Sequence, residues 1–173
     1  MDQHLQRASE ALWLAAGTLT IDRLTARPSS DKWTIAQILE HLSRAFAGTA
    51  EGARRVLAKG HPTARALDAG ARLRIFVVVE CGYLPTGRKA PNMTLPVGAD
   101  PATVLSDAID NLRRMDAALH ETARVFGAGV KLMDHPILGP LSTRQWRRFH
   151  WIHTRHHVRQ IVARAGQSSA LPS

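Results

Sequence analysis

Cysteine, long apolar runs and acidic side chains are all scarce in this chain. The single cysteine, Cys81, excludes an intramolecular disulfide, so the fold must rest on packing or on a bound metal. We expect Cys81 to be a small buried hydrophobic residue. The first residues show no basic stretch followed by an apolar core, and no window approaches the roughly 18 consecutive apolar residues of a membrane span. These absences predict a cytoplasmic protein with no signal peptide and no membrane contact.

The deficit of acidic groups gives the chain a formal net charge of +9, from 23 Lys and Arg against 14 Asp and Glu. Such a charge attracts polyanions at modest salt. The arginines near the C-terminus form two clusters, which are Arg144, Arg147 and Arg148, then Arg155, Arg159 and Arg164. Because no DNA-reading motif is present, we interpret the clusters as solvated helix faces and expect no nucleic-acid partner.

Apolar residues, at 45% of the chain, are numerous enough to form a buried core. The length fits one domain, which we place at residues 1–166, followed by a flexible C-terminal tail at residues 167–173. Helical periodicity predicts four long helices, so the expected fold class is all-α. They cover residues 2–20, a segment from Thr34, a segment from Asp100 to about residue 124, and a segment after Ser142.

Two of these helices begin with the same signal. Thr34 and Gln37 have the spacing of a capping box, and so do Ser142 and Gln145. For the third helix we expect Asp100 as the N-cap, because a proline follows it at the first turn. Capping boxes fix where a helix enters a bundle, and therefore where its later side chains project. Both helices with a capping box carry histidines further along.

The connections between the helices differ in character. Residues 21–32 fit a surface loop because proline and serine interrupt the periodicity. Residues 60–99 separate the second and third helices, which is a long connection for a compact domain. Within it, residues 67–83 fit a buried helix or contain a short strand, and we favour the helix. Residues 84–98 have the proline and glycine content of an irregular crossing loop, and residues 134–140 are expected to form turns.

Histidine is concentrated near the C-terminus, where four of the nine histidines fall within residues 150–157. At about 100° per residue, His153 and His157 lie one turn apart on the face that points to the core. His41 lies on the apolar face of the second helix. His156 is turned about 100° away from His157 and need not share its surroundings. Two helices are therefore expected to aim imidazoles inward.

Inward-facing imidazoles need either a hydrogen-bond partner or a metal, because the protein interior offers no water in exchange. Neutral imidazole nitrogens suit divalent zinc, nickel and similar ions. The spacing of the histidines leaves two interpretations open, a metal site and a polar helix face.

Other polar residues near the histidines also have alternative interpretations. His150 is a candidate pocket acid or base, or else a histidine at the rim. Gln160 is a candidate for orienting a bound water or a ligand imidazole, or else a polar residue that caps the core. We retain these two as catalytic candidates. Glu40 is expected to point off the core face and receives no role, and His135 is expected to serve a turn.

Two motifs carry a resemblance to a known family. The helix-two signature of the DinB-like superfamily is similar to the first motif, Trp33-Thr34-Ile35-Ala36-Gln37-Ile38-Leu39-Glu40-His41-Leu42. The signature of its last helix resembles the second motif, His153-x-x-His156-His157-x-x-Gln160. The resemblance implies a four-helix bundle with up-down-down-up connectivity and a long crossover between helices two and three. It also implies a divalent metal held by His41, His153 and His157.

A metal held by three histidines keeps positions open for water, a thiol or a substrate oxygen. The resemblance therefore implies a metal-dependent enzyme, either a thiol-dependent transferase or a metal-dependent hydrolase. Its substrate would be a small molecule, with a low-molecular-weight thiol as one candidate. Zinc or nickel is the expected ion, and iron or manganese the alternative. The other hypothesis is a non-catalytic, metal-stabilised protein that binds a small ligand. Four tryptophans in a small bundle are also compatible with a homodimer.

Overall fold

The computed structural model describes residues 1–29, 32–85 and 90–167, and these residues are mostly helical. A small two-stranded sheet is added to the helices, so the all-α expectation holds broadly. Residues 168–173 of the expected tail lie outside the described residues, whereas Gln167 belongs to the last helix. In the described part of the chain, no helix is long and apolar enough to cross a membrane.

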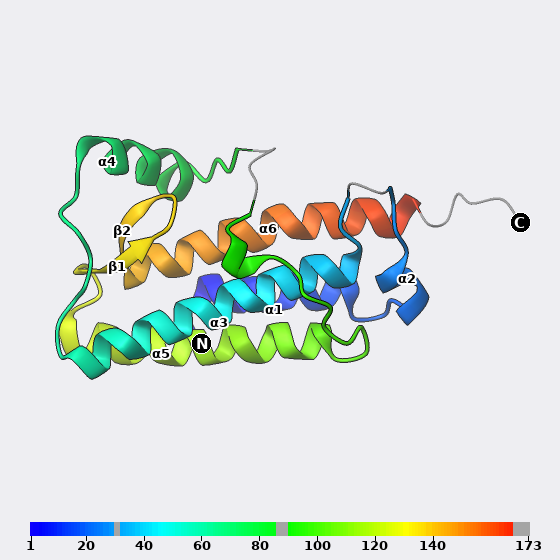
Figure 1. The fold of residues 1–173 in the computed structure, drawn as a ribbon, viewed down its shortest axis with the longest axis horizontal. Coiled ribbons are helices and arrows are strands. Elements are labelled where there is room, and N and C mark those ends of the chain that lie inside the picture. The colour runs from blue at the N-terminus through cyan, green and yellow to red at the C-terminus, as the bar shows by residue number, and fades with distance from the viewer. Residues whose placement is uncertain (30–31, 86–89, 168–173) are drawn as a thin grey trace, which may run out of the picture.

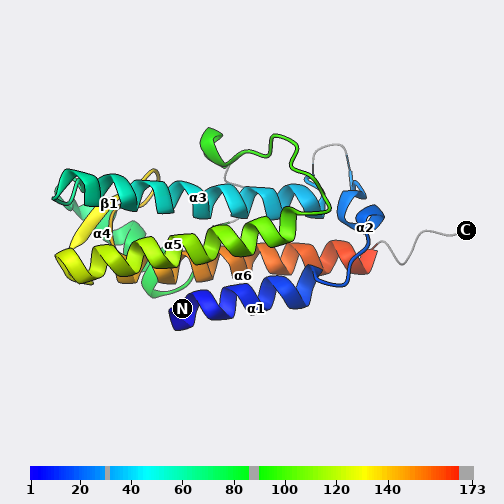
Figure 2. The same ribbon diagram turned by 90° about the horizontal axis from the view of Figure 1, so that it is seen from below.

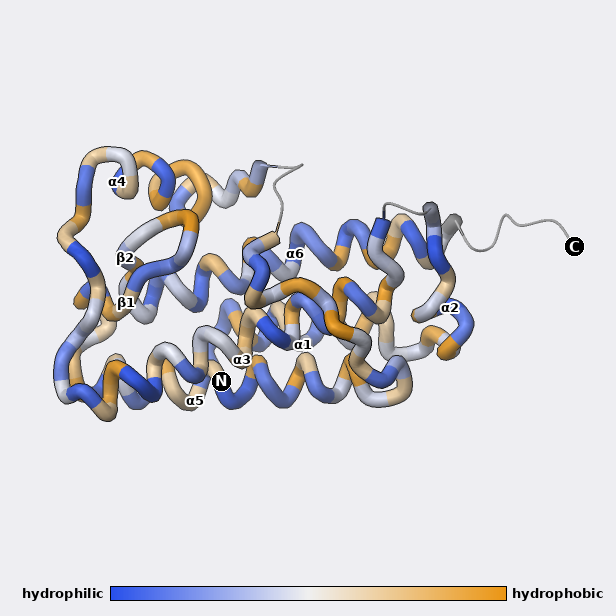
Figure 3. Tube along the Cα trace, in the orientation of Figure 1, coloured by the Kyte–Doolittle hydropathy of each residue, from blue (hydrophilic) through white to orange (hydrophobic). Residues whose placement is uncertain are grey.

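Four long helices lie side by side in Figures 1 and 2, and they are α1 (Gln3–Ala16), α3 (Ile35–Lys59), α5 (Val104–Phe126) and α6 (Thr143–Gln167). α3 packs most extensively on α5, and α1 on α6. The colours of Figure 1 show that α3 and α5 run in one direction and that α1 and α6 run in the other. Figure 3 shows apolar and polar residues alternating along these helices, as expected of elements with one buried face. Each helix contributes to one core, for example through Leu12, Phe46, Leu112 and Ile161.

Both predicted capping boxes are present. Thr34 Oγ1 accepts from the backbone N–H of Gln37 at 3.1 Å, and the Gln37 side chain accepts from the backbone N–H of Thr34 at 2.9 Å. Ser142 and Gln145 exchange the same two bonds at the start of α6, each at 3.3 Å. Gly60 ends α3 in the left-handed conformation, at φ 72°. The starts of the two histidine-bearing helices are therefore as the sequence predicts.

Two other predicted boundaries are wrong. Residues 21–32 are not all loop, because Ile21–Thr25 forms a short helix, α2, with Thr20 as its N-cap. Asp100 is not the N-cap of α5, which begins at Val104. The carboxylate of Asp100 instead accepts a backbone N–H in a turn before the helix. Side chains of this kind stabilise turns as readily as helix starts, and sequence spacing alone does not separate the two outcomes.

The crossover between α3 and α5 is partly helical. It contains α4 (Ala69–Ile75), a turn of π-helix (η1, Phe76–Glu80) and a short 3-10 helix (η2, Asn92–Thr94). Residues 69–80 are therefore helical and the strand alternative is wrong, but the expectation of a buried helix over residues 67–83 is met only in part, because Leu73 and Phe76 are exposed. Cys81 is exposed, which corrects the expectation of a buried residue, because it lies just beyond the packed π-helical turn. Residues 86–89 of the predicted crossing loop lie outside the described residues.

The segment before α6 forms a hairpin where the sequence indicated only turns. β1 (Lys131–His135) pairs antiparallel with β2 (Gly139–Ser142). Nδ1 of His135 accepts from the backbone N–H groups of Ile137 and Leu138, at 3.1 and 3.2 Å, so this histidine serves the turn as expected. The strands are short and β2 contains a proline, which hides the alternation that signals a strand.

Three arginines of α6 bind other parts of the protein. Arg148 donates to the side chain of Glu80 at 3.0 Å and to its carbonyl at 2.7 Å, and Arg155 donates to a second carbonyl of the crossover at 3.2 Å. Arg147 pairs with Asp116 of α5 at 3.1 Å, and its side chain is 13% exposed. The interpretation as a solvated face is therefore wrong for Arg147. The other two arginines hold the crossover against α6.

Candidate metal centre

The structure brings together three histidines that the sequence singles out, His41 from α3 and His153 and His157 from α6. Nε2 of His153 lies 3.1 Å from Nε2 of His41 and 3.1 Å from Nε2 of His157. The ring centroids are 4.7 to 5.1 Å apart. Within the described ranges, no other group of three or more His, Cys, Asp or Glu side chains converges in this way.

Hydrogen-bond acceptors fix the proton of two of these rings. Nδ1 of His41 donates to the carbonyl of Thr94 at 2.9 Å, and Nδ1 of His157 donates to Oε1 of Gln160 at 2.9 Å. Because a neutral imidazole carries one N–H, Nε2 of each ring is left as an unprotonated acceptor. Both unprotonated nitrogens face Nε2 of His153.

His153 cannot satisfy both neighbours. A proton on its Nε2 can point to only one acceptor, and a proton on its Nδ1 leaves three lone pairs facing one another. Its Nδ1 is itself buried and has no hydrogen-bond partner among the residues that the structure describes. A cation between the three lone pairs removes their conflict. Two nitrogens bound to one zinc ion at about 2.1 Å in tetrahedral geometry lie about 3.4 Å apart. The 3.1 Å separations are close to this value, so the donor set fits a divalent metal.

Burial keeps the three imidazoles neutral. Loss of hydration and the neighbouring His41 together lower the pKa of His157 to about 3, against the opposing effect of its hydrogen bond to Gln160. Burial also lowers the pKa of His41, against the opposing effect of its bond to the Thr94 carbonyl. The pKa of His153 lies well below its usual range because of burial and the adjacent imidazoles. Metals bind the neutral ring, so the ligands are in the required form at neutral pH. His41 and His157 are buried, and His153 is partly buried.

Gln160 lies where a residue that orients a ligand imidazole must lie. Its Oε1 accepts from His157, and its Nε2 donates to Nε2 of His156 at 3.1 Å. The amide oxygen thus faces His157 and the amide nitrogen faces His156, so Gln160 bridges the two imidazoles. His156 stays outside the group of converging nitrogens, as its spacing predicts, and holds Gln160 in place.

His150, the other catalytic candidate, lies apart from the converging nitrogens. It is 1% exposed, and its Nε2 forms a hydrogen bond with the hydroxyl of Thr49 at 2.9 Å. The ring stacks on Trp146 and meets Phe46 edge-on. Burial lowers its pKa to about 3. The expectation of a rim histidine is therefore wrong, because the side chain has packed into the core between α3 and α6.

The position of Glu40 differs from the expectation that it points off the core face and has no role. It is 5% exposed, and its carboxylate accepts from the backbone N–H groups of residues 97–99 at 2.7 to 3.1 Å. Burial raises the pKa of this carboxyl, but the three donors outweigh burial and hold the pKa below its usual range. Thr94, which orients His41, lies in the same loop. Sequence reasoning missed Thr94 because a backbone carbonyl leaves no mark on residue type.

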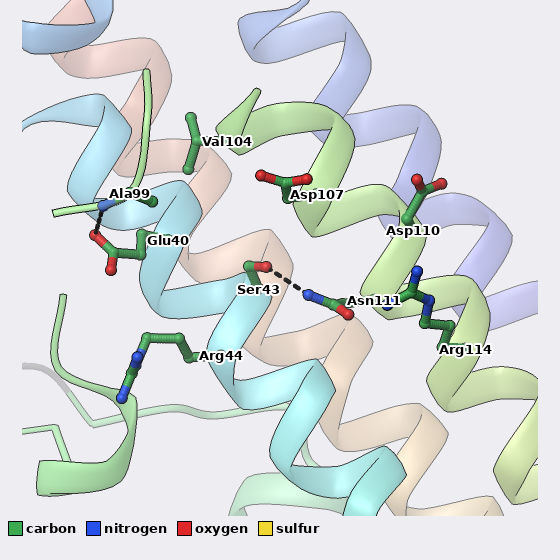
Figure 4. Close-up of a pocket in the computed structure, with 9 residues that line it drawn as sticks. All are labelled: Glu40, Ser43, Arg44, Ala99, Val104, Asp107, Asp110, Asn111 and Arg114. Carbon is green, nitrogen blue, oxygen red and sulfur yellow. Dashed lines mark hydrogen bonds between the residues drawn. The ribbon is translucent and has the colours of Figure 1, made fainter. Parts of the chain in front are cut away.

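A cavity of about 290 Å³ lies between α3 and α5 (Figure 4). Figure 4 shows Glu40 bonded to Ala99 at its edge and Ser43 bonded to Asn111 across it. Its lining carries charges of both signs and includes none of the three converging histidines. The cavity and the candidate metal centre are therefore separate features.

A comparison with known proteins identifies a family for the chain. No curated protein and no solved structure matches it. Residues 9–164 match a family model, and this span contains the three converging histidines and Gln160. Because the match extends over most of its length, the chain belongs to the family described as "Protein of unknown function (DUF1569)".

Proposed function

We propose that the protein is a divalent-metal-dependent enzyme of the DinB-like superfamily, with His41, His153 and His157 as the metal ligands. The observation that carries this proposal is the convergence of three neutral imidazoles, two of which have their Nδ1 protons committed to other acceptors. The proposed architecture is the up-down-down-up four-helix bundle, with residues 60–99 as the crossover. The opposite directions of the α1/α6 and α3/α5 pairs support it, as do the two sequence motifs.

Three imidazole ligands suit zinc or nickel, with iron and manganese as alternatives. When bound, such an ion supplies Lewis acidity and lowers the pKa of a water or thiol that it binds. Two hydrogen bonds within the protein orient the ligands: the Thr94 carbonyl accepts from His41, and the Gln160 side chain accepts from His157. Of the three ligands, His153 is the one whose side chain is partly exposed.

A set of three protein ligands favours catalysis over a purely structural metal, since structural zinc usually has four protein ligands. Two reactions fit the open positions, transfer of a low-molecular-weight thiol to an electrophile and hydrolysis of a small ester or amide. One observation favours the second candidate function, a metal-stabilised protein that binds a small ligand without turnover. His150, the candidate acid or base, is buried against Thr49 and away from the centre.

Metal analysis tests the proposal. The purified chain, loaded with zinc or nickel and freed of excess ion, should hold close to one ion per molecule by elemental analysis. The loaded protein should then turn over either a small thiol with an electrophile or a member of an ester and amide panel. A chain that retains no metal contradicts the metal centre. Retained metal with no turnover in either panel favours the non-catalytic binder.

A further inference from the structure

The loop that carries Thr94 is fastened to one stretch of α3. Glu40 accepts from the N–H groups of residues 97–99, and His41 donates to the carbonyl of Thr94. One turn further along, Arg44 donates to the carbonyl of the residue before Thr94 at 3.2 Å. The 3-10 turn of the loop has its own internal bonds, with the Thr94 N–H and hydroxyl both donating to the carbonyl of Pro91 at 2.9 Å. These internal bonds shape the turn, but only the contacts with α3 set its distance from His41.

Among the contacts that fasten the loop, the one with Glu40 is the strongest. Hydrogen bonds to an ionised acceptor are about twice as strong as neutral ones, and this carboxylate accepts three of them. It is also 5% exposed, so water competes with it little. Arg44 contributes a single bond from a side chain that solvent reaches. Only two residues separate Thr94 from Val97, so the Thr94 carbonyl must follow the position of the gripped amides.

We propose that Glu40 is a positioning residue of the metal centre. By gripping residues 97–99 it holds the Thr94 carbonyl against Nδ1 of His41, and this keeps His41 in the tautomer whose Nε2 binds the metal. The role in metal binding rests on the proposed function. The control of the His41 tautomer does not, because the hydrogen bonds that exert it are formed by the protein alone.

Glu40→Gln tests this role. Glutamine keeps the shape of the side chain, but it removes the charge and sets an amide NH₂ against a backbone N–H that needs an acceptor. In wild-type protein, the Nδ1–H of His41 should be protected from exchange with solvent, as followed by nitrogen-15 NMR of the imidazoles with and without zinc. In the variant, this proton should exchange about tenfold faster or more. Zinc affinity, measured by competition with a chelator, should fall about 10- to 100-fold, the range for groups that orient a ligating histidine.

Asp116→Asn is the matched control. Asp116 is also a buried carboxylate that accepts a backbone N–H, from Asp2 at 3.0 Å, but it anchors the N-terminus and pairs with Arg147. This variant should lower the unfolding temperature while leaving the His41 proton and the zinc affinity as in wild type. Glu40→Asp, which keeps the charge on a shorter side chain, should recover part of the protection and part of the affinity.

The outcomes separate this inference from the proposed function. A folded Glu40→Gln variant with wild-type protection of the His41 proton and wild-type zinc affinity overturns the inference. If wild-type protein binds no zinc, the proposed function fails, and the His41 proton in metal-free protein still decides whether Glu40 positions the ring. If Glu40→Gln does not fold, Glu40→Asp takes its place, and unchanged proton exchange in that variant overturns the inference.

Discussion

α6 carries two sets of inward-facing histidines with opposite arrangements. Near its start, Nε2 of His150 meets the hydroxyl of Thr49, while its Nδ1 is buried with no hydrogen-bond partner among the described residues. One turn further along, His153 and His157 face His41, and nitrogen meets nitrogen. Burial lowers pKa values in both sets. The comparison shows that a buried histidine with a lowered pKa is not by itself a metal-ligand candidate. The convergence of unprotonated nitrogens is what separates the second set from the first.

Removal of one converging imidazole should have the largest effect. His157→Ala removes one of the three ligand nitrogens. Loss of a group that only orients a ligand lowers metal affinity by up to about 100-fold, so zinc affinity should fall by more than this in His157→Ala. His150→Gln is the matched change two turns earlier on the same helix. It should keep wild-type zinc affinity and lower the free energy of unfolding by about 2 kcal/mol, because it disturbs a buried, hydrogen-bonded core residue.

Chelator competition and chemical unfolding of both variants measure the two quantities. If His150→Gln weakened zinc binding as much as His157→Ala, the two sets of histidines would not be functionally distinct. Wild-type affinity in His157→Ala would remove this residue from the proposed ligands.

We expect the free energy of unfolding to depend on pH through His150. Its pKa is about 3 in the folded protein against an ordinary value of 6.5, so below pH 6.5 the unfolded chain takes up a proton that the folded state does not. The contribution of His150 to stability is therefore complete above pH 6.5 and is lost as the pH falls toward 3. At pH 4 the loss from this residue should be about 3 kcal/mol.

Chemical unfolding of metal-free protein at pH 7 and pH 4 measures this loss. His150→Gln cannot take up the proton, so the difference in its unfolding free energy between the two pH values should be smaller than in wild type by about 3 kcal/mol. An equal difference in the two proteins would mean that other groups cause the acid sensitivity.

The inward direction of the three histidines was predictable from short-range spacing, whereas their convergence across 112 residues was implied only by the resemblance of the two motifs to the DinB-like superfamily. The capping boxes at Thr34 and Ser142 fix where α3 and α6 begin, and helical periodicity then places His41, His153 and His157 on inward faces. The same periodicity does not decide whether a flanking residue such as His150 faces the core or the rim. Its burial depends on partners from α3, which no local pattern reveals.

The groups that orient the ligands could be predicted only in part. The role of Gln160 could be predicted because it lies one turn from His157 on the same helix. Thr94 was not, since it acts through a backbone carbonyl of a loop that is 53 residues from His41 in the sequence. Glu40 looked solvent-facing because a carboxylate on a helix usually is, and the amides that bury it begin 57 residues later. Long-range contacts of a loop leave no periodic pattern.

The smallest expected effect tests whether His41 is positioned by the N-terminal cap of α3 or by the contact with the loop. Thr34→Ala removes the hydroxyl that accepts from the N–H of Gln37, so the free energy of unfolding should fall by about 1 kcal/mol. Thr34→Ser keeps the hydroxyl and should retain most of this stability. Since Thr34 lies about two turns from His41, its loss should change zinc affinity by less than about twofold. Urea unfolding and chelator competition on the same samples measure both effects. If Thr34→Ala weakened zinc binding as much as Glu40→Gln, the start of the helix rather than the gripped loop would set the position of His41.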